Sequence, residues 1–286
     1  MLVNGKFILN KALENHYALG AFNANNMEFV QAIIKAAEEE EAPVFLQISQ
    51  GAINYAGMEM TTAMVKEAAN NTKIPVVLHL DHSTNFEQNI KALKMGFTSL
   101  MFDGSNLSYE ENIKITSDIV RIAHSVDIPV EAELGKVTNI KDNLSPDQIK
   151  NMMTDPAKAK DFVEKTKVDF LAVAIGNVHK MEKNIIELDI ERLKEINKMI
   201  PQIPLVLHGS SGVSFNSLQR AIKYGLSKIN VATQLNIAFL DELNKILIEN
   251  KFEKDIRKIL GPCRDKVKQK VKEYIQILGS SGKAFL

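Results

Sequence analysis

Short apolar runs recur along the whole chain and alternate with segments that have a helical pattern. In NNMEFVQAIIKAAEEE (25–40), for example, apolar side chains recur every three or four residues and fall on one face. The strand-like runs are ALGAFN (18–23), PVFLQIS (43–49), PVVLHLD (75–81), SLMFDGS (99–105), PVEAELG (129–135), FLAVAIG (170–176), PLVLHGS (204–210) and KINVAT (228–233).

This alternation predicts the fold class. Nearly continuous apolar strands separated by helices are typical of a parallel α/β sheet covered on both faces. Eight such units within 286 residues favour a closed (β/α)8 barrel, a TIM barrel, with extra C-terminal helices and one domain over residues 1–286. An open, doubly wound sheet is the structural alternative.

Polar side chains gather at the C-terminal ends of the predicted strands. In a barrel these ends meet at one mouth, where barrel enzymes carry out their chemistry. We therefore expect one shared polar pocket. Its candidate residues are Asn23, Gln47, Ser49, Asp81, His82, Asp103, Ser105, Glu131, Glu133, Asn177, His179, His208, Ser210, Asn230 and Thr233.

Three histidines occupy equivalent positions in this pattern. His82, His179 and His208 each lie at or just after a strand end, beside a turn. Three imidazoles with a nearby carboxylate are typical of a catalytic Zn²⁺ site that keeps its fourth position open. The alternative is that local hydrogen bonds satisfy each ring separately.

The carboxylates at the mouth require partners. Glu131 and Glu133 are two residues apart on a strand and share a face, so two like charges there need a cation or a shared proton. A metal or a lysine such as Lys136 would supply compensation, and an internal ion-pair network is the alternative. Asp81 either orients a histidine or transfers a proton.

The segment HGSSGVS (208–214) suggests a phosphate site. Gly209 lets the backbone approach a ligand, the serines add donors, and loops after strands seven and eight are a frequent phosphate site in barrels. On its own, such a Gly-Ser segment is also compatible with an ordinary turn.

Composition excludes several classes of partner and location. The net charge is zero, which gives no reason to expect nucleic acid or an anionic membrane. No apolar run approaches ~18 residues, so no membrane span is expected. The single cysteine, Cys263, excludes an internal disulfide and is typical of a reducing cytosol. No signal peptide is evident, and we expect a cytoplasmic protein.

Seven motifs keep the order and spacing of a known family. They are FNANN, QISQGA, LHLDHS, VEAELGKV, LAVAIGNVH, LHGSSGV and NVATQLNIAF. The chain resembles the class II, metal-dependent ketose-bisphosphate aldolases from its N-terminus to LGSSGK. LAVAIG and NVAT are closer to the tagatose type, because the fructose type usually has aspartate at the position of Ala232.

The resemblance implies a reaction and a role for each site residue. The reaction is reversible cleavage of a ketose 1,6-bisphosphate to dihydroxyacetone phosphate and an aldehyde. Zn²⁺ would be bound by His82, His179 and His208, with Glu133 as a further or second-site ligand, and Na⁺ or K⁺ would lie near the substrate phosphate. Asp81 would move the proton of the C4 hydroxyl. The substrate would contact Asn23, Ser49, Lys183, Gly209, Ser211, Asn230 and Thr233.

A metal is also favoured over a Schiff-base lysine by the strands themselves. Cleavage beside a ketone leaves an enediolate whose charge needs stabilisation, by a Lewis-acid metal or by a lysine imine. We expect no lysine in the core of any barrel strand, and the runs FLAVAIG and PLVLHGS have none. We expect a homo-oligomer, a dimer or a tetramer.

Three departures from the family pattern bear on activity. Lys141 stands where the family has a loop glutamate that moves a proton, and we expect the adjacent Asp142 to replace it in part. The surrounding segment, from Gly135 to about Asp155, is expected to be a mobile lid. Lys180 replaces a glycine, and Lys272 replaces an arginine that binds the distal phosphate.

Two other functions remain open. A non-catalytic homologue that binds sugar phosphates is compatible with the lysine replacements. A zinc hydrolase would need a His-x-His after strand one and an aspartate after strand eight, which GAFNAN and NVAT lack.

Overall fold

The eight apolar runs form parallel strands of one sheet in the order β3-β2-β1-β10-β9-β7-β5-β4. The computed structural model describes residues 1–139, 145–180 and 185–285. The sheet strands are β1 (Leu19–Asn23), β2 (Val44–Ser49), β3 (Val76–Asp81), β4 (Leu100–Phe102), β5 (Val130–Leu134), β7 (Phe170–Val173), β9 (Leu205–Leu207) and β10 (Leu226–Val231).

Backbone hydrogen bonds between β3 and β4 close the sheet into a barrel. The amide of Leu80 donates to the carbonyl of Ser99 at 3.1 Å, and the amide of Thr98 donates to Leu78 at 3.0 Å. Among the described residues, these bonds join the two strands at the ends of the strand order. The predicted (β/α)8 barrel is confirmed, and the open doubly wound sheet is wrong.

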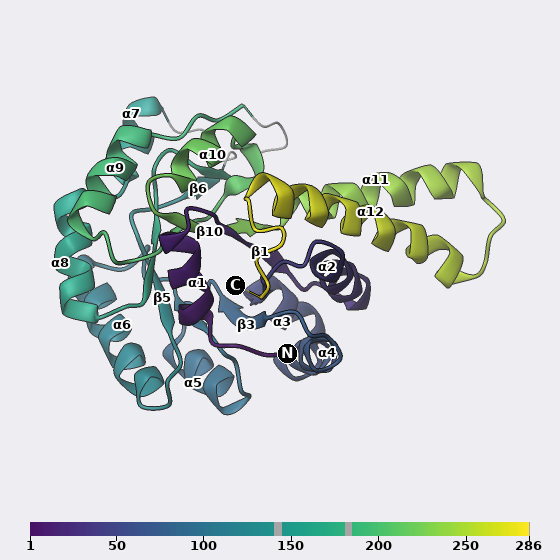
Figure 1. Cartoon of the computed structure of the whole chain (residues 1–286), viewed down its shortest axis with the longest axis horizontal. Helices are drawn as coiled ribbons and strands as arrows, with labels where there is room; N and C mark the ends of the chain where they lie inside the picture. Colours follow the sequence, from purple (N-terminus) through teal and green to yellow (C-terminus); the bar gives the residue numbers. More distant parts are fainter. Residues whose placement is uncertain (140–144, 181–184, 286) are drawn as a thin grey trace.

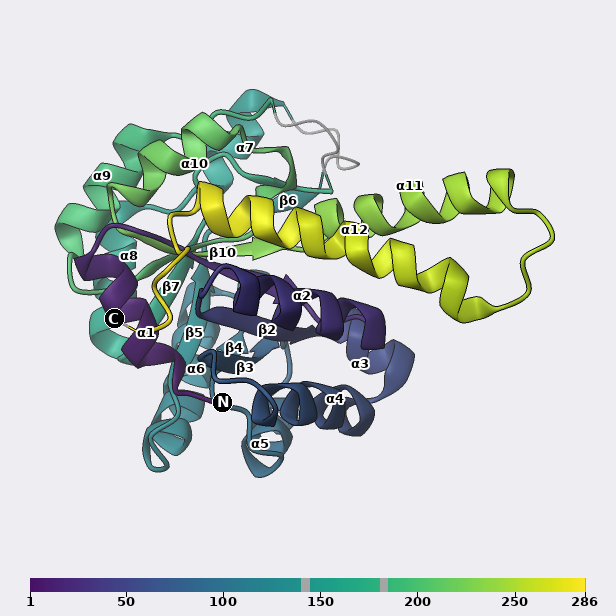
Figure 2. The same cartoon turned by 45° about the vertical axis from the view of Figure 1, so that its right-hand side comes forward.

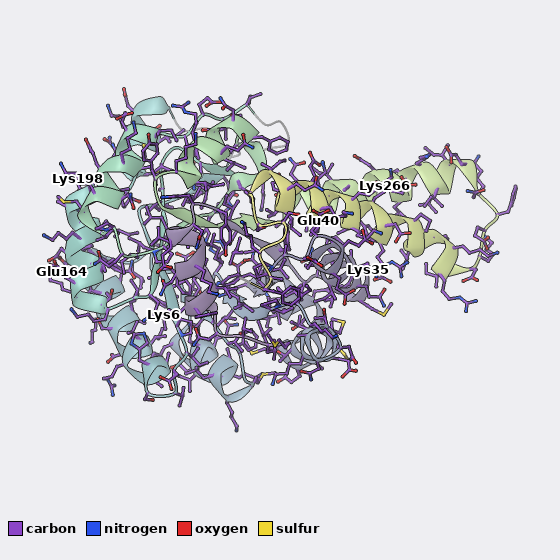
Figure 3. All side chains as sticks on the ribbon, viewed as in Figure 1. Lys6, Lys35, Glu40, Glu164, Lys198 and Lys266 are labelled. Atoms are coloured by element: carbon purple, nitrogen blue, oxygen red, sulfur yellow. The ribbon has the colours of Figure 1, made fainter. Side chains whose placement is uncertain are left out.

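Helices surround the barrel, as Figure 1 shows. Most of these helices have a polar N-cap residue. The Asn26 side chain accepts a hydrogen bond from the amide of Phe29 at 3.0 Å, and the Asn85 side chain accepts one from the amide of Gln88 at 2.9 Å. The helices are α2 (Met27–Glu39), α3 (Gln50–Ala56), α4 (Met58–Asn70), α5 (Phe86–Lys94), α6 (Tyr109–His124), α7 (Pro146–Met152), α8 (Pro156–Thr166), α9 (Ile190–Met199) and α10 (Phe215–Ile222). Charged residues of both signs, such as Glu164 and Lys198, lie on their outer faces (Figure 3).

Two apolar cores hold the barrel together. One fills the space between the strands and the surrounding helices. The other lies inside the barrel, where Phe45, Val77 and Phe170 are fully buried. Helix α1 (Gly5–Glu14), which the sequence pattern did not predict, packs Leu9 and Ala12 onto this inner core and closes the N-terminal end. The opposite end is left for the polar residues.

The extra C-terminal helices form a long hairpin. Helix α11 (Thr233–Glu249) leaves the barrel mouth, and α12 (Ile256–Ile277) returns beside it, so that the pair projects from the barrel (Figures 1 and 2). The returning helix packs along α2, where Lys268 and Lys272 each lie 2.9 Å from the carboxylate of Glu39. Lys272, the expected substitute for a phosphate-binding arginine, is therefore engaged in an ion pair. Among the described residues, no helix is long and apolar enough to cross a membrane.

Candidate active site

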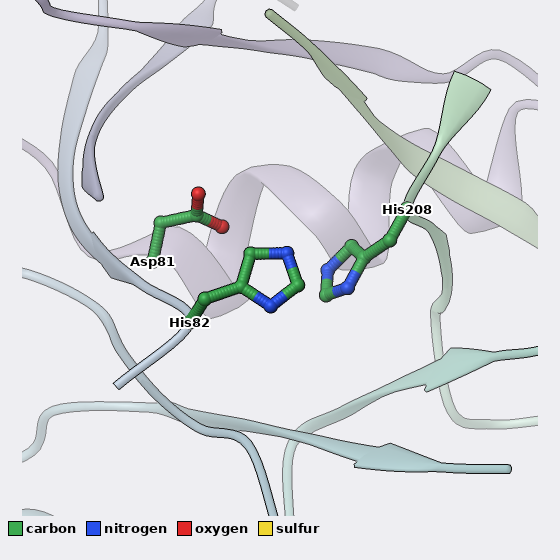
Figure 4. A group of neighbouring side chains, drawn as sticks. All are labelled: Asp81, His82 and His208. Atoms are coloured by element: carbon green, nitrogen blue, oxygen red, sulfur yellow. The ribbon is translucent and has the colours of Figure 1, made fainter. Parts of the chain in front are cut away.

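Asp81 and His82 lie where β3 ends at the mouth of the barrel. The ring of His82 faces that of His208, with ring centroids 4.4 Å apart (Figure 4). A ligand atom of Asp81, one of His82 and one of His208 all lie within 4.8 Å of one another. Two of the three predicted histidines thus come together with a carboxylate, in a group able to hold a metal ion.

His179 lies next to this group but is not part of it. It belongs to β8 (Val178–His179), a short strand that pairs with β6 (Thr138–Asn139) outside the barrel sheet. Its ring centroid is 5.7 Å from that of His82. The structure therefore brings His179 beside the other two histidines, and the full three-histidine ligand set stays a prediction.

Two carboxylates on neighbouring strands orient the histidines. The Nδ1 atom of His208 lies 2.8 Å from Glu133 Oε2, and Nδ1 of His82 lies 3.0 Å from Asp103 Oδ2. His82, Asp103 and Glu133 form a second group able to hold a metal. Sequence reasoning placed Asp103 at the mouth but gave it no role, although it ends strand four just as Asp81 ends strand three.

Burial and these partners shift the histidine pKa values in opposite directions. Burial alone would lower the pKa of His208, but its bonds to Glu131 and Glu133 outweigh burial and raise it to about 10. Burial, together with the neighbouring His82 and His208, lowers the pKa of His179 to about 3. In the metal-free protein, His208 is therefore protonated, whereas His179 is neutral.

Glu131 is neutralised by Lys228 on β10, so the expectation that no barrel strand has a lysine in its core is wrong. Its Oε2 lies 2.9 Å from Nζ of Lys228, inside the barrel, and its Oε1 lies 2.9 Å from Nε2 of His208. Burial would raise the pKa of Glu131, but Lys228 and His208 hold it well below its usual range. For Glu131 the ion-pair alternative is thus correct, and Lys136, which is exposed, is not the partner.

A cavity of about 200 Å³ opens beside these groups at the barrel mouth. It brings together every predicted substrate-binding residue that the structure describes. Its lining residues are Asn23, Gln47, Ser49, Asp81, His82, His179, Lys180, Gly209, Ser210, Ser211, Asn230, Ala232 and Thr233. Asp142 and Lys183, together with Lys141, lie outside the described residues. Gln47, to which the prediction gave no role, donates to Asn23 at 2.8 Å.

One end of the cavity has unused hydrogen-bonding capacity. The Ser211 hydroxyl is buried without a hydrogen-bond partner among the described residues. Gly209 has a left-handed φ of 58°, and a Cβ there would lie 2.9 Å from the backbone carbon of Val178. Helix α11 begins at Thr233 without a side-chain cap. An anion bound here would satisfy the hydroxyl and the amides of the helix terminus.

Backbone strain also concentrates at this mouth. Within the described chain, six residues other than glycine have a left-handed φ, and four of them follow helix ends, where this conformation is common. The other two are His82 (φ 50°) and Lys180 (φ 62°), and both follow strands that reach the cavity. Strained backbone at a cleft is typical of functional residues.

The segment after β5 is tied to the barrel on both sides of its undescribed part. The Thr154 hydroxyl accepts the amide of Ala174 at 2.8 Å and donates to the carbonyl of Leu134. The amide of Lys136 donates to Met152 at 2.9 Å. The mobility expected of this segment stays a prediction.

Comparison with known proteins agrees with this geometry. The family model described as "Fructose-bisphosphate aldolase class-II" matches residues 3–283. Fructose-bisphosphate aldolases from Helicobacter pylori and Thermus caldophilus are 43% and 41% identical, each over 99% of this chain and all of the relative. The crystal structure of the YdjI aldolase from Escherichia coli K12 superposes with a TM-score of 0.86 at 35% identity, covering 99% of this chain and 100% of that one. The chain therefore belongs to the class II fructose-bisphosphate aldolase family, a metal-dependent family of lyases.

Proposed function

We propose that the cavity at the barrel mouth cleaves a ketose 1,6-bisphosphate, of the fructose or tagatose type, to dihydroxyacetone phosphate and an aldehyde such as glyceraldehyde 3-phosphate. The observation that carries this assignment is the meeting of Asp81, His82 and His208 beside the unpartnered hydroxyl of Ser211. A metal-binding group and an anion-binding end thus share one small cavity. Family membership supports the same reaction.

The donor set supports Zn²⁺ as the ion. We assign His82, His179 and His208 as its ligands, with Glu133 as a further ligand or part of a second site. Nitrogen and carboxylate ligands of this kind suit zinc. When bound, the ion would supply Lewis-acid stabilisation of the negative charge that develops on substrate oxygens during cleavage.

The chain's own residues bind the substrate and move a proton. Asp81 is buried at the cavity wall, and its Oδ1 accepts a hydrogen bond from Asn230 Nδ2 at 2.9 Å. We assign Asp81 as the group that exchanges a proton with the C4 hydroxyl. Asn23, Ser49 and Asn230 would contact the ketose.

The phosphate of the dihydroxyacetone half would occupy the anion-binding end, near Gly209, Ser211 and Thr233. The charge of that phosphate would be balanced by Lys183, with Na⁺ or K⁺ on backbone carbonyls. Lys141 stands at the family's loop glutamate, so Asp142 is assigned the remaining proton transfer. Asp142 and Lys183 enter this proposal from the family pattern alone.

Metal content and a retro-aldol assay test the proposal together. We expect about one zinc ion per chain in the purified protein, near-complete loss of metal in His208→Ala, and cleavage of fructose or tagatose bisphosphate by the wild type. Comparing the two sugars identifies the substrate. A protein that keeps its metal after His208→Ala contradicts the ligand assignment. A protein that binds dihydroxyacetone phosphate but cleaves neither sugar is the non-catalytic homologue.

We also propose that the chain is cytoplasmic and forms a homo-oligomer. Leu247, Ile248, Phe252 and Ile256 are exposed near the tip of the projecting hairpin. Apolar side chains grouped at one exposed place are typical of an interface. Light scattering on the purified protein measures the oligomer, and Phe252→Asp with Ile248→Asp is expected to weaken it.

A further inference from the structure

Lys228 is a fully buried lysine inside the barrel, and it does not line the active-site cavity. It lies on β10, with its ammonium 2.9 Å from Glu131 Oε2, 2.8 Å from Asn230 Oδ1 and 5.6 Å from the ring centroid of Phe45. A lysine is rarely buried completely, because an unpaired ammonium loses its hydration. The contacts that compensate the charge of Lys228 connect it to two different parts of the active site.

One direction leads to the metal-binding group. Glu131 uses its other oxygen, Oε1, to contact Nε2 of His208 at 2.9 Å. When His208 is neutral, a proton on Nε2 that is donated to Glu131 leaves the lone pair on Nδ1. Nδ1 is the atom that faces Glu133. The Lys228–Glu131 pair thus anchors the Nε2 side of the ring and leaves Nδ1 on the side of the second carboxylate.

The other direction leads to the proton-transfer group. An ammonium can only donate, so Lys228 holds the Oδ1 atom of Asn230 toward itself. The Nδ2 atom of Asn230 then points to Asp81 and donates to its Oδ1 at 2.9 Å. Without the ammonium, Asn230 keeps only its contact with Asp81, and its buried Oδ1 atom loses the donor that holds the side chain in place.

We propose that Lys228 is a positioning residue that couples the two halves of the active site. It fixes Glu131, and thereby the ring of His208, and it fixes Asn230, and thereby the carboxylate of Asp81. The effect on turnover rests on the proposed function, whereas the effects on metal binding and on side-chain geometry do not. No contact with substrate is assigned to Lys228.

The test is Lys228→Met, which removes the ammonium but keeps an unbranched side chain. We expect the dissociation constant for Zn²⁺ to rise about 10-fold or more, on the scale seen for outer partners of metal ligands. We expect kcat to fall by a larger factor than KM rises, because Lys228 lies outside the cavity and reaches the substrate only through Asn230. A crystal structure of the metal-free variant should show the side chains of Asn230 and Asp81 displaced from their wild-type positions.

Two further variants separate positioning from stability. Lys228→Met with Glu131→Gln removes both buried charges and still offers an acceptor to His208. We expect its Tm and zinc affinity to recover toward wild type, whereas kcat stays low because Asn230 remains unfixed. Val77→Ala, in the same inner core and without polar contacts, should lower Tm and leave zinc affinity unchanged. The double variant also serves if Lys228→Met does not fold.

The outcomes distinguish the two proposals. Wild-type zinc affinity and kcat in Lys228→Met, with only Tm lowered, would overturn the positioning role. Recovery of kcat together with Tm in the double variant would overturn the proposed effect of Lys228 on Asn230. If the wild type cleaves no sugar bisphosphate, the proposed function fails. The zinc titration and the crystal structure then still decide the role of Lys228.

Discussion

Asp81 and Asp103 lie at neighbouring strand ends but contact different groups. Replacing each of them should therefore impair a different property of the protein. Asp81 contacts Asn230 at the cavity wall, whereas Asp103 holds Nδ1 of His82 at 3.0 Å. We expect Asp81→Ala to keep its metal and lose roughly 10²–10⁴-fold in kcat, the usual scale for a general acid–base group. Asp103→Ala should instead weaken zinc binding by about 10–100-fold. Metal analysis and steady-state kinetics of both variants make the comparison.

One experimental result would contradict the assignment of Asp81 as the proton-transfer group. One oxygen of Asp81 lies in a group with His82 and His208 that is able to hold a metal. If Asp81→Ala loses its zinc as completely as His208→Ala, Asp81 is a ligand and not a proton-transfer group.

Lys180 offers a second test at the scale of one residue, because its strain and its charge can be separated. It has a φ of 62° and lines the cavity. Replacing it with glycine removes a left-handed side chain, for a net gain of up to about 1 kcal/mol in the free energy of unfolding. If its ammonium contacts a substrate phosphate, Lys180→Gly should also raise KM for the bisphosphate several-fold.

The matched control is Lys167→Gly. Lys167 has a φ of 60° at the C-terminal end of α8, is exposed, and is not among the cavity residues. The Lys167→Gly variant should show a similar gain in the free energy of unfolding, with no change in KM. Equal KM values in the two variants would mean that Lys180 has no role in binding.

At the scale of elements, the loop after β9 positions β8 by direct contact. A Cβ on Gly209 would lie 2.9 Å from the backbone carbon of Val178 and 3.1 Å from the backbone nitrogen of His179. Gly209→Ala should therefore destabilise the protein by roughly 1–3 kcal/mol. It should also weaken zinc binding, because the backbone of His179 has to move.

Gly261→Ala is the control for this substitution. Gly261 lies inside α12 with nothing within 4 Å of the added Cβ. Alanine there should change the free energy of unfolding by less than about 1 kcal/mol, because its better helix propensity is opposed by crowding against Pro262, and it should leave the zinc affinity unchanged. Denaturant unfolding and zinc titration of both variants give the two quantities. Wild-type zinc affinity in Gly209→Ala would show that β8 does not depend on this contact.

Strand ends were predictable from sequence because nearly continuous apolar runs with polar residues at their ends are local signals. The same-face argument placed Glu131 and Glu133 together, and both contact His208. The same parity, applied to Lys228 and Asn230, would have revealed the buried lysine. Helix α1 was missed because its role, covering the open end of the inner core, exists only once the barrel has closed.

At the scale of the whole molecule, the barrel interior is apolar toward α1 and carries a charged network toward the mouth. His79 lies at the boundary, fully buried, with Nδ1 2.8 Å from the Ser99 hydroxyl and Nε2 3.6 Å from Glu131 Oε2. Burial lowers the pKa of His79 well below its usual value, and nearby Lys228 lowers it further against the pull of Glu131. His208 and His82 act in the same direction as Lys228.

The lowered pKa of His79 determines whether the free energy of unfolding rises or falls with pH. Above pH ~6.5, His79 is neutral in the folded and unfolded states and contributes no slope. Below that pH the unfolded chain takes up a proton that the folded protein refuses, so stability falls by up to about 1.4 kcal/mol per pH unit for this one group. His179, with its pKa lowered to about 3, adds a loss of the same sign.

The measurement is chemical unfolding of the chelator-treated protein from pH 7.5 to 5.0, for the wild type and for His79→Asn. Asparagine can keep a hydrogen bond to Ser99 but cannot be protonated in this range. We expect His79→Asn to be less stable at pH 7.5, because it leaves a cavity beside Phe45, whose ring lies 5.7 Å from that of His79. Its slope below pH 6.5 should be shallower than that of the wild type, with the remainder due to His179 and the carboxylates. An unchanged slope would mean that His79 takes up its proton in the folded state, which its burial between Lys228 and Phe45 should prevent.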